Sequence, residues 1–136
     1  MTPQLGRLVI YTRKTDAMMA FYSAHFGYEA VRLPGDRIVE LRPPGQGAAI
    51  LLHPASKGQR GGQSLVKLVF DVPDVNAACD AAKARGLEFG AIHHADGYSF
   101  ANTKDPSGNS VQLSSRAYSG RAAPPEPGGT TSDDDI

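Results

Sequence analysis

The sequence predicts an α+β fold built from two consecutive modules, each with the element order βαβββ. One observation is a repeat. An apolar, strand-like run at residues 7–12 leads to an acidic residue and a helical stretch, and the same order begins again about 60 residues later with the run at residues 67–72. The other is that three strand-like runs, separated by Gly and Pro turns, follow each helical stretch. A duplication of this kind usually creates a site at the seam between its halves.

The first module begins with a strand at residues 6–12, which is rich in Leu, Val, Ile and Tyr. Asp16 is the expected N-cap of a helix that runs to Gly27, and a glycine suits the C-cap because it tolerates a left-handed backbone. Apolar side chains recur through this stretch at helical spacing: Met18, Met19, Phe21, Tyr22 and Phe26. The segment is therefore predicted to be an amphipathic helix.

Three further strands, at residues 28–33, 37–42 and 47–53, complete the first module. A Pro-Gly-Asp turn joins the first two, and residues 37–42 alternate polar and apolar side chains, as a half-buried strand does. Residues 55–63 contain several glycines, and we expect them to form a flexible connector.

The second module repeats this order, with a strand at residues 64–72 and a helix capped by Asp74 that ends at Gly86. Strands are expected at residues 87–92, 98–102 and 110–114, and a strong turn signal at residues 105–109 precedes the last one. His93 and His94 are assigned to a surface loop. Because adjacent residues of a strand point to opposite faces, this pair could not hold one metal ion together even on a strand.

Composition limits the possible partners and the domain organisation. The chain has 136 residues, 40% of them hydrophobic. Its 14 basic and 14 acidic side chains balance, so it lacks the positive net charge that favours binding of nucleic acid. No apolar run approaches the ~20 residues of a membrane-spanning helix, and a lone cysteine, Cys79, forms no disulfide framework, so a cytoplasmic location is expected. We expect one domain over residues 1–118 and a disordered tail over residues 119–136, rich in Pro, Gly, Ser and Asp.

Several motifs resemble the vicinal oxygen chelate superfamily, which includes glyoxalase I, the bleomycin-resistance proteins, the fosfomycin-resistance enzymes and the extradiol dioxygenases. They are Phe21-Tyr22 followed by Phe26-Gly27-Tyr28, the stretch Phe70-Asp71-Val72-Pro73-Asp74-Val75, and the turn Asp105-Pro106-Ser107-Gly108-Asn109. The resemblance covers two modules, at about residues 5–54 and 64–116. It implies a cupped mixed β-sheet with helices on its convex face and the site on its concave face, and it implies a homodimer.

The two-residue period of a strand predicts which side chains face this cup. If Arg7 faces the cup, Tyr11 does too, and by the same rule Lys67 faces inward on the corresponding strand of the second module. On the last strand the apolar residues face the helix, which leaves Gln112 in the cup. The candidate ligand-binding residues are therefore Arg7, Tyr11, Lys67 and Gln112.

The resemblance also implies where a metal ion would bind, and the residues there are poor ligands. Metal-using members carry His or similar ligands where this chain has Arg7 and Lys67, and a carboxylate where it has Gln112. Arginine keeps its proton, and two cations would repel a divalent ion. We therefore expect no cofactor. A divalent metal held by a displaced set, Glu40, His53 and Gln112, is the alternative.

Three functions follow from these residues. The favoured one is a metal-free binding protein in which Arg7 and Lys67 hold a small ligand, preferably an anion, with Tyr11 as a wall and Gln112 as a neutral hydrogen-bonding group. The second is a glyoxalase-like lyase or dioxygenase that uses the displaced metal set. The third is an interaction module with a filled cup.

No catalytic residue is assigned, because Cys79 lies among small helical residues as a packed thiol would. Ordinary ion pairs are the structural alternative to a binding role for the two cations. In that case Arg7 would pair with Glu40, and Lys67 with Asp71.

Overall fold

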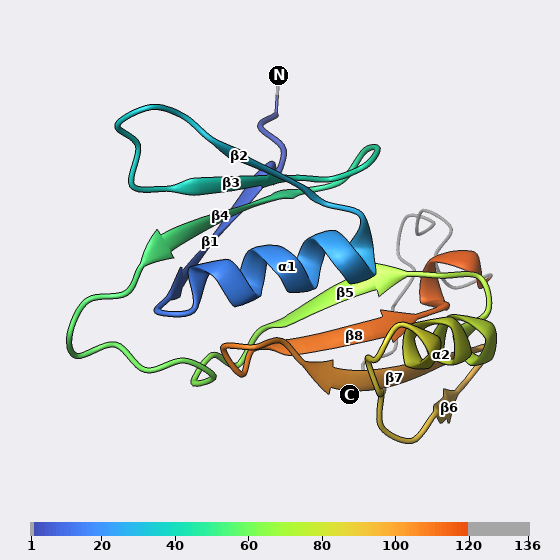
Figure 1. The fold of residues 1–136 in the computed structure, drawn as a ribbon. Coiled ribbons are helices and arrows are strands. Elements are labelled where there is room, and N and C mark those ends of the chain that lie inside the picture. The colour runs from blue at the N-terminus through green and yellow to red at the C-terminus, as the bar shows by residue number, and fades with distance from the viewer. Residues whose placement is uncertain (1, 120–136) are drawn as a thin grey trace. The chain divides into compact units, whose positions relative to one another are not determined.

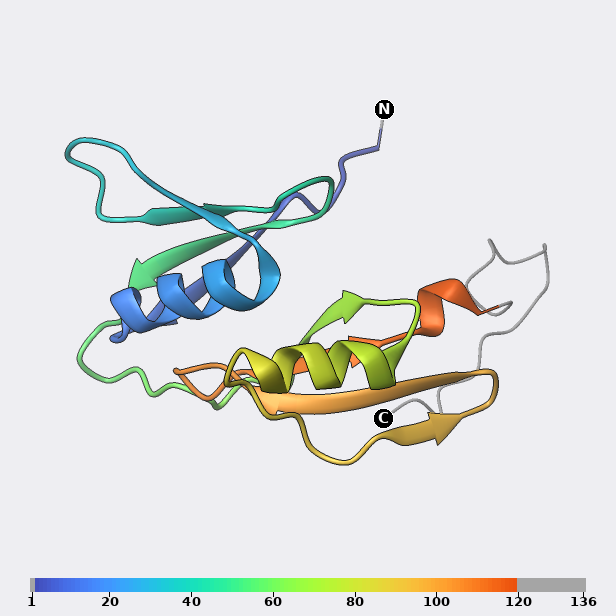
Figure 2. The same ribbon diagram turned by 45° about the vertical axis from the view of Figure 1, so that its right-hand side comes forward.

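The computed structural model describes residues 2–119, which form two compact units (Figures 1 and 2). The first unit comprises the chain up to Leu65 together with Asp105–Asn109, and the second comprises Val66–Lys104 and the described residues from Ser110 onward. The predicted disordered tail, apart from Ser119, lies outside the described residues. The assignment of residues 1–118 to one domain stays a prediction.

The first unit has the predicted order βαβββ. Its elements are β1 (Arg7–Thr12), α1 (Thr15–Phe26), β2 (Glu29–Arg32), β3 (Val39–Arg42) and β4 (Ala49–Pro54). The strand order in the sheet is β1-β4-β3-β2, with β1 parallel to β4 and the other pairs antiparallel. Helix α1 crosses one face of this sheet (Figure 1).

The second unit repeats this arrangement. Its elements are β5 (Lys67–Asp71), α2 (Val75–Ala84), β6 (His93–Ala95), β7 (Tyr98–Lys104) and β8 (Ser110–Ser114), followed by a short 3₁₀ helix, η1 (Arg116–Tyr118). The strand order is β5-β8-β7-β6, and again only the first pair is parallel. The α+β class and the duplicated βαβββ order are therefore confirmed.

The first strand of each unit alternates between its two faces as predicted. In β1, Leu8 and Ile10 are half-buried on the helix side, whereas Val9 and Tyr11 are 51% and 47% exposed. In β5, Val69 is 49% exposed on the face away from the helix. We call the sheet surface opposite the helix the helix-free face of each unit. It carries the predicted site residues.

The core of the first unit lies between α1 and the other face of its sheet. Met18 and Tyr22 of the helix are fully buried and pack with apolar side chains of the two inner strands, Val39, Leu41, Ile50 and Leu52. Burial of such side chains contributes roughly 1.5–3 kcal/mol each, which fixes the helix on the sheet. The helix-free face is consequently the face of this sheet that its own helix leaves uncovered.

Two local predictions were wrong. Helix α1 begins at Thr15, so Asp16 lies in its first turn and is not the N-cap; Lys14 occupies that position, and its N–H bonds the Thr12 hydroxyl at 2.9 Å. The strand predicted at residues 87–92 is at His93–Ala95, so His93 and His94 lie on a strand and not in a loop. The turn at Gly97, whose φ is 86°, sets this register by pairing Ala95 with Tyr98. The other predicted strands differ from the observed ones only at their ends.

A buried carboxylate fixes the β7–β8 turn within the first unit. Asp105 is 4% exposed, and it accepts hydrogen bonds from the Tyr22 hydroxyl at 2.8 Å and from the backbone N–H groups of Ser107 and Asn109. The side-chain amide of Asn109 also donates to it. Burial, and then the adjacent Asp105 charge, raises the pKa of Tyr22, so this hydroxyl stays protonated and serves as a donor.

Within residues 2–119, no helix combines the length and the apolar character that a membrane crossing requires.

Replacing Tyr22 with Phe should lower the free energy of unfolding by about 2 kcal/mol, because the buried Asp105 carboxylate would lose a charged hydrogen bond. Urea denaturation measures this loss. Tyr118→Phe is the matched control, since Tyr118 is exposed, and it should change stability by no more than about 0.5 kcal/mol. Equal midpoints for the two variants would contradict this role for Asp105.

Candidate functional site

Arg7 and Tyr11 lie on β1 at the helix-free face of the first unit, Arg7 two positions before Val9 and Tyr11 two positions after it. The parallel register sets Tyr11 beside His53 of β4, and their ring centroids lie 4.8 Å apart. His53 Nδ1 lies 2.9 Å from the Pro54 carbonyl oxygen. Because that oxygen only accepts, Nδ1 donates the hydrogen in this contact.

The alternative in which Arg7 pairs with Glu40 is not what the structure shows. Glu40 bonds Arg42 of its own strand, with 2.7 Å between Glu40 Oε2 and Arg42 Nε. Among residues 2–119, Arg7 takes part in no ion pair. Its guanidinium is thus a charge on the helix-free face without an acidic partner in the described chain.

In the second unit, Lys67 and Gln112 both donate to one oxygen. Lys67 Nζ lies 3.3 Å and Gln112 Nε2 lies 3.0 Å from Oδ1 of Asn102. The register explains this cluster, because Gln112 of β8 pairs with Asn102 of β7 on one side and with Val69 of β5 on the other. Gln112 is 6% exposed, so its amide is held in a fixed position.

The alternative in which Lys67 pairs with Asp71 is likewise absent, since the described part of the chain shows no ion pair between them. Asn102 was missed by the sequence analysis. Only the cross-strand register reveals that it lies between the lysine and the glutamine, and no local motif signals it. The lysine keeps hydrogen-bonding capacity beyond Asn102, since an ammonium group has three donors.

The described residues do not provide the ligand set that a divalent metal needs. No three His, Cys, Asp or Glu side chains within residues 2–119 lie close enough to hold an ion together. In the displaced set, Glu40 is held by Arg42, His53 packs against Tyr11, and Gln112 donates to Asn102. Each of these side chains therefore already has a partner within its own unit, and the displaced metal set stays a prediction.

Cys79 does not add a nucleophile. It is half-buried on α2, and burial, followed by the nearby Asp80 charge, raises the pKa of its thiol. A raised pKa lowers the thiolate fraction at neutral pH, and the thiolate is the reactive form.

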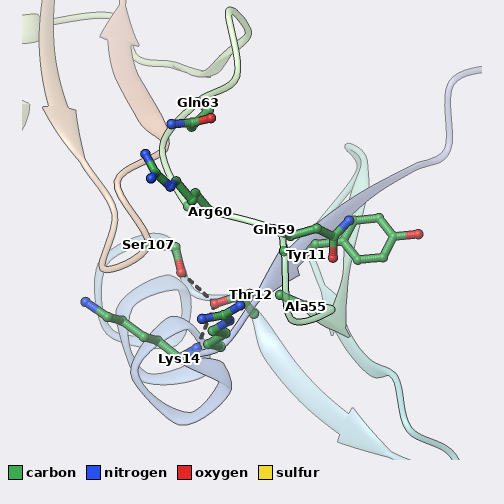
Figure 3. A pocket seen from close by; sticks show the side chains of 11 residues that line it. Tyr11, Thr12, Lys14, Ala55, Gln59, Arg60, Gln63 and Ser107 are labelled. Carbon is green, nitrogen blue, oxygen red and sulfur yellow. Dashed lines mark hydrogen bonds between the residues drawn. The ribbon is translucent and has the colours of Figure 1, made fainter.

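The first unit also contains a pocket of about 590 Å³, which is shown in Figure 3. It lies where β1 ends and α1 begins, between residues 55–63 and the 105–109 turn. Its lining residues are Tyr11, Thr12, Arg13, Lys14, Ala55, Gly58, Gln59, Arg60, Gly61, Gln63 and Ser107. Of the four predicted binding residues, it includes only Tyr11.

Residues 55–63 were predicted to be a flexible connector, and the structure gives them specific contacts. Arg13 donates to the carbonyl oxygens of Ser56, at 3.0 Å, and Lys57. The Ser56 N–H donates to the side-chain carbonyl of Gln59 at 2.7 Å, which closes a local turn. The segment is thus a defined wall of the pocket.

Glycine at position 61 allows this wall to approach the 105–109 turn. A Cβ at Gly61 would lie 2.3 Å from the backbone oxygen of Ser107, closer than real Cβ atoms come to another atom. Ser107 in turn shares a hydrogen bond with Thr12, with 2.5 Å between the two hydroxyl oxygens. The turn, the end of β1 and the wall therefore meet at the pocket.

The comparisons with known proteins establish the family. Residues 4–113 match the family model described as Glyoxalase/Bleomycin resistance protein/Dioxygenase superfamily, and the chain belongs to this superfamily. A search of the curated proteins found no significant match to the chain.

Solved structures share the fold at low sequence identity. TnmS3, an antibiotic-binding protein from Streptomyces sp. CB03234, is 19% identical with a TM-score of 0.69, over 82% of this chain and 94% of TnmS3. A superfamily member from Sphaerobacter thermophilus DSM 20745 is 23% identical with a TM-score of 0.66, over 83% and 97% of the two chains. Lactoylglutathione lyase from Agrobacterium tumefaciens is 24% identical with a TM-score of 0.59, over 83% and 93%.

Replacing Gly61 with Ala should lower the free energy of unfolding by about 1–3 kcal/mol, because the added methyl group forces residues 55–63 away from the Ser107 backbone. Thermal or urea denaturation measures the effect. Gly45→Ala is the control, since no atom lies within 4 Å of a Cβ at that position. If both variants unfold at the same midpoint, the close approach at Gly61 is wrong.

Proposed function

We propose that this chain is a small-molecule-binding member of its superfamily that holds a small anionic ligand without a metal ion. One observation carries the proposal. Each unit begins its first strand with a cation, Arg7 or Lys67, and neither cation is ion-paired with an acidic side chain in the described residues. Unpaired cations beside apolar surface favour an anionic partner.

The neighbouring side chains on each helix-free face suit this role. Beside Arg7, the exposed Val9 and Tyr11 offer an apolar and aromatic surface, and the guanidinium can form two parallel hydrogen bonds with a carboxylate or phosphate. Beside Lys67, the amides of Asn102 and Gln112 supply neutral hydrogen-bonding groups. Each face therefore offers a charge to an anionic head, and the face beside Arg7 also offers contacts to a small organic body.

Relatives support binding of a small molecule more directly than they support a reaction. TnmS3 is described as an antibiotic-binding protein, so this fold serves binding in at least one similar protein. Lactoylglutathione lyase shows that the fold also serves enzymes, and members that use a metal need a ligand set that the described residues here do not assemble. A homodimer remains a proposal that rests on the family resemblance.

Arg7→Ala and Lys67→Ala should each weaken binding of a small anion by about tenfold, because each removes a charge-assisted contact, and should leave the unfolding midpoint nearly unchanged. Thermal-shift screening with benzoate, succinate, citrate and other small carboxylates selects the probe, and calorimetry with that probe gives the affinities.

Arg37→Ala and Lys83→Ala are the matched controls, because both are exposed cations, Arg37 between β2 and β3 and Lys83 on helix α2. They should bind the probe like the unchanged chain. The proposal fails if no small anion binds, or if the Arg7 and Lys67 variants bind as tightly as these controls.

A further inference from the structure

The geometry points to a second binding site, the pocket at the end of β1, which takes a phosphate-bearing small molecule. The pocket is lined by three cations, Arg13, Lys14 and Arg60, and by no Asp or Glu. The whole chain has a formal net charge of zero, so this charge is concentrated locally. A hollow lined by one sign of charge attracts ligands of the opposite sign.

The charges surround a pair of hydroxyl groups. Thr12 and Ser107 are joined by their 2.5 Å hydrogen bond, and Figure 3 shows them meeting between the side chains of Arg60 and Lys14. Phosphate oxygens accept hydrogen bonds from both hydroxyl and cationic donors. One hydroxyl hydrogen is used in the bond between Thr12 and Ser107, so the pair keeps one hydroxyl hydrogen to donate beside the cationic side chains.

Helix α1 adds to the positive electrostatic potential of the pocket. Its N-cap, Lys14, makes no side-chain capping bond, and the twelve-residue helix begins at the pocket with its positive dipole end. The acidic residue of the first turn, Asp16, is directed to Arg32 at 3.3 Å and does not line the pocket. The helix therefore reinforces the attraction for an anion that the three side chains create.

Charge and size together select the class of ligand. Three cations suit a doubly charged phosphate ester better than a single carboxylate, because the second negative charge of the ligand is also attracted by the same three cations. A volume of about 590 Å³ exceeds what a bare phosphate fills, and the Tyr11 ring and Ala55 can contact an organic body. We therefore assign the site to organic phosphates.

This site does not depend on the proposed function, because its cations differ from Arg7 and Lys67 and only Tyr11 is shared. Arg13 is left out of the test, since it also holds the Ser56 and Lys57 carbonyls and its loss would release the wall. Within residues 2–119, the side chains of Arg60 and Lys14 hold no part of the wall by a hydrogen bond or ion pair. They are the informative positions.

Calorimetry of the full chain with phenyl phosphate, inorganic phosphate and phenol tests the site. Phenyl phosphate should bind more tightly than inorganic phosphate, and phenol should not bind measurably. Lys14→Ala and Arg60→Ala should each weaken phenyl phosphate binding at least about fivefold, and Arg60→Gln, which keeps most of the side chain, should do the same.

Lys57→Ala is the matched control, because Lys57 lies in the same segment but does not line the pocket. It should bind phenyl phosphate normally. The assignment is overturned if phenyl phosphate does not bind, or if the Arg60 variants bind it as the Lys57 variant does. If only Arg7→Ala loses phenyl phosphate binding, the ligand binds at the helix-free face and the pocket assignment is wrong. Circular dichroism confirms that each variant is folded.

Discussion

The carboxylate of Asp105 is the interaction on which the rest of the first unit depends. It is almost fully buried, so each of its hydrogen bonds offsets a large desolvation cost. The bond to Tyr22 fixes the 105–109 turn on α1, and the backbone bonds within the turn fix the position of Ser107. Ser107 then meets Thr12 at the end of β1 and Gly61 on the pocket wall. One buried carboxylate thereby fixes the turn that the end of β1 and the pocket wall both contact.

Features that depend on neighbouring residues could be predicted from the sequence. The alternation of β1 and β5 follows from the two-residue period, and the structure confirms it through the exposed Val9 and Val69. Asp74 caps α2 as predicted, accepting from the N–H of Ala77 at 3.0 Å, because a cap is defined within a single turn. The fold class follows because the same local pattern occurs twice in the chain.

Features that depend on distant contacts could not be predicted. Asn102 joins Lys67 and Gln112 only because two strand pairings bring them together. The register of a sheet depends on how strands pair, so the sequence of one strand does not determine it. The basic pocket could not be predicted because its cations come from two segments, one at the start of α1 and one after β4, that lie far apart in the sequence. The glycines near Arg60 suggested flexibility, whereas Gly61 permits a close backbone approach to the 105–109 turn.

The central claim, that this chain binds its ligand without a metal ion, is tested most directly by metal analysis. The measurement is the metal content of the tag-free full chain by mass spectrometry, before and after equilibration with Mn, Fe, Ni and Zn salts and removal of the excess. The account predicts no stoichiometric retention of any of these metals, because the described residues assemble no cluster of three His, Cys, Asp or Glu side chains. Retention of one metal ion per chain, or per pair of chains, would contradict it and direct the search to lyase and dioxygenase substrates.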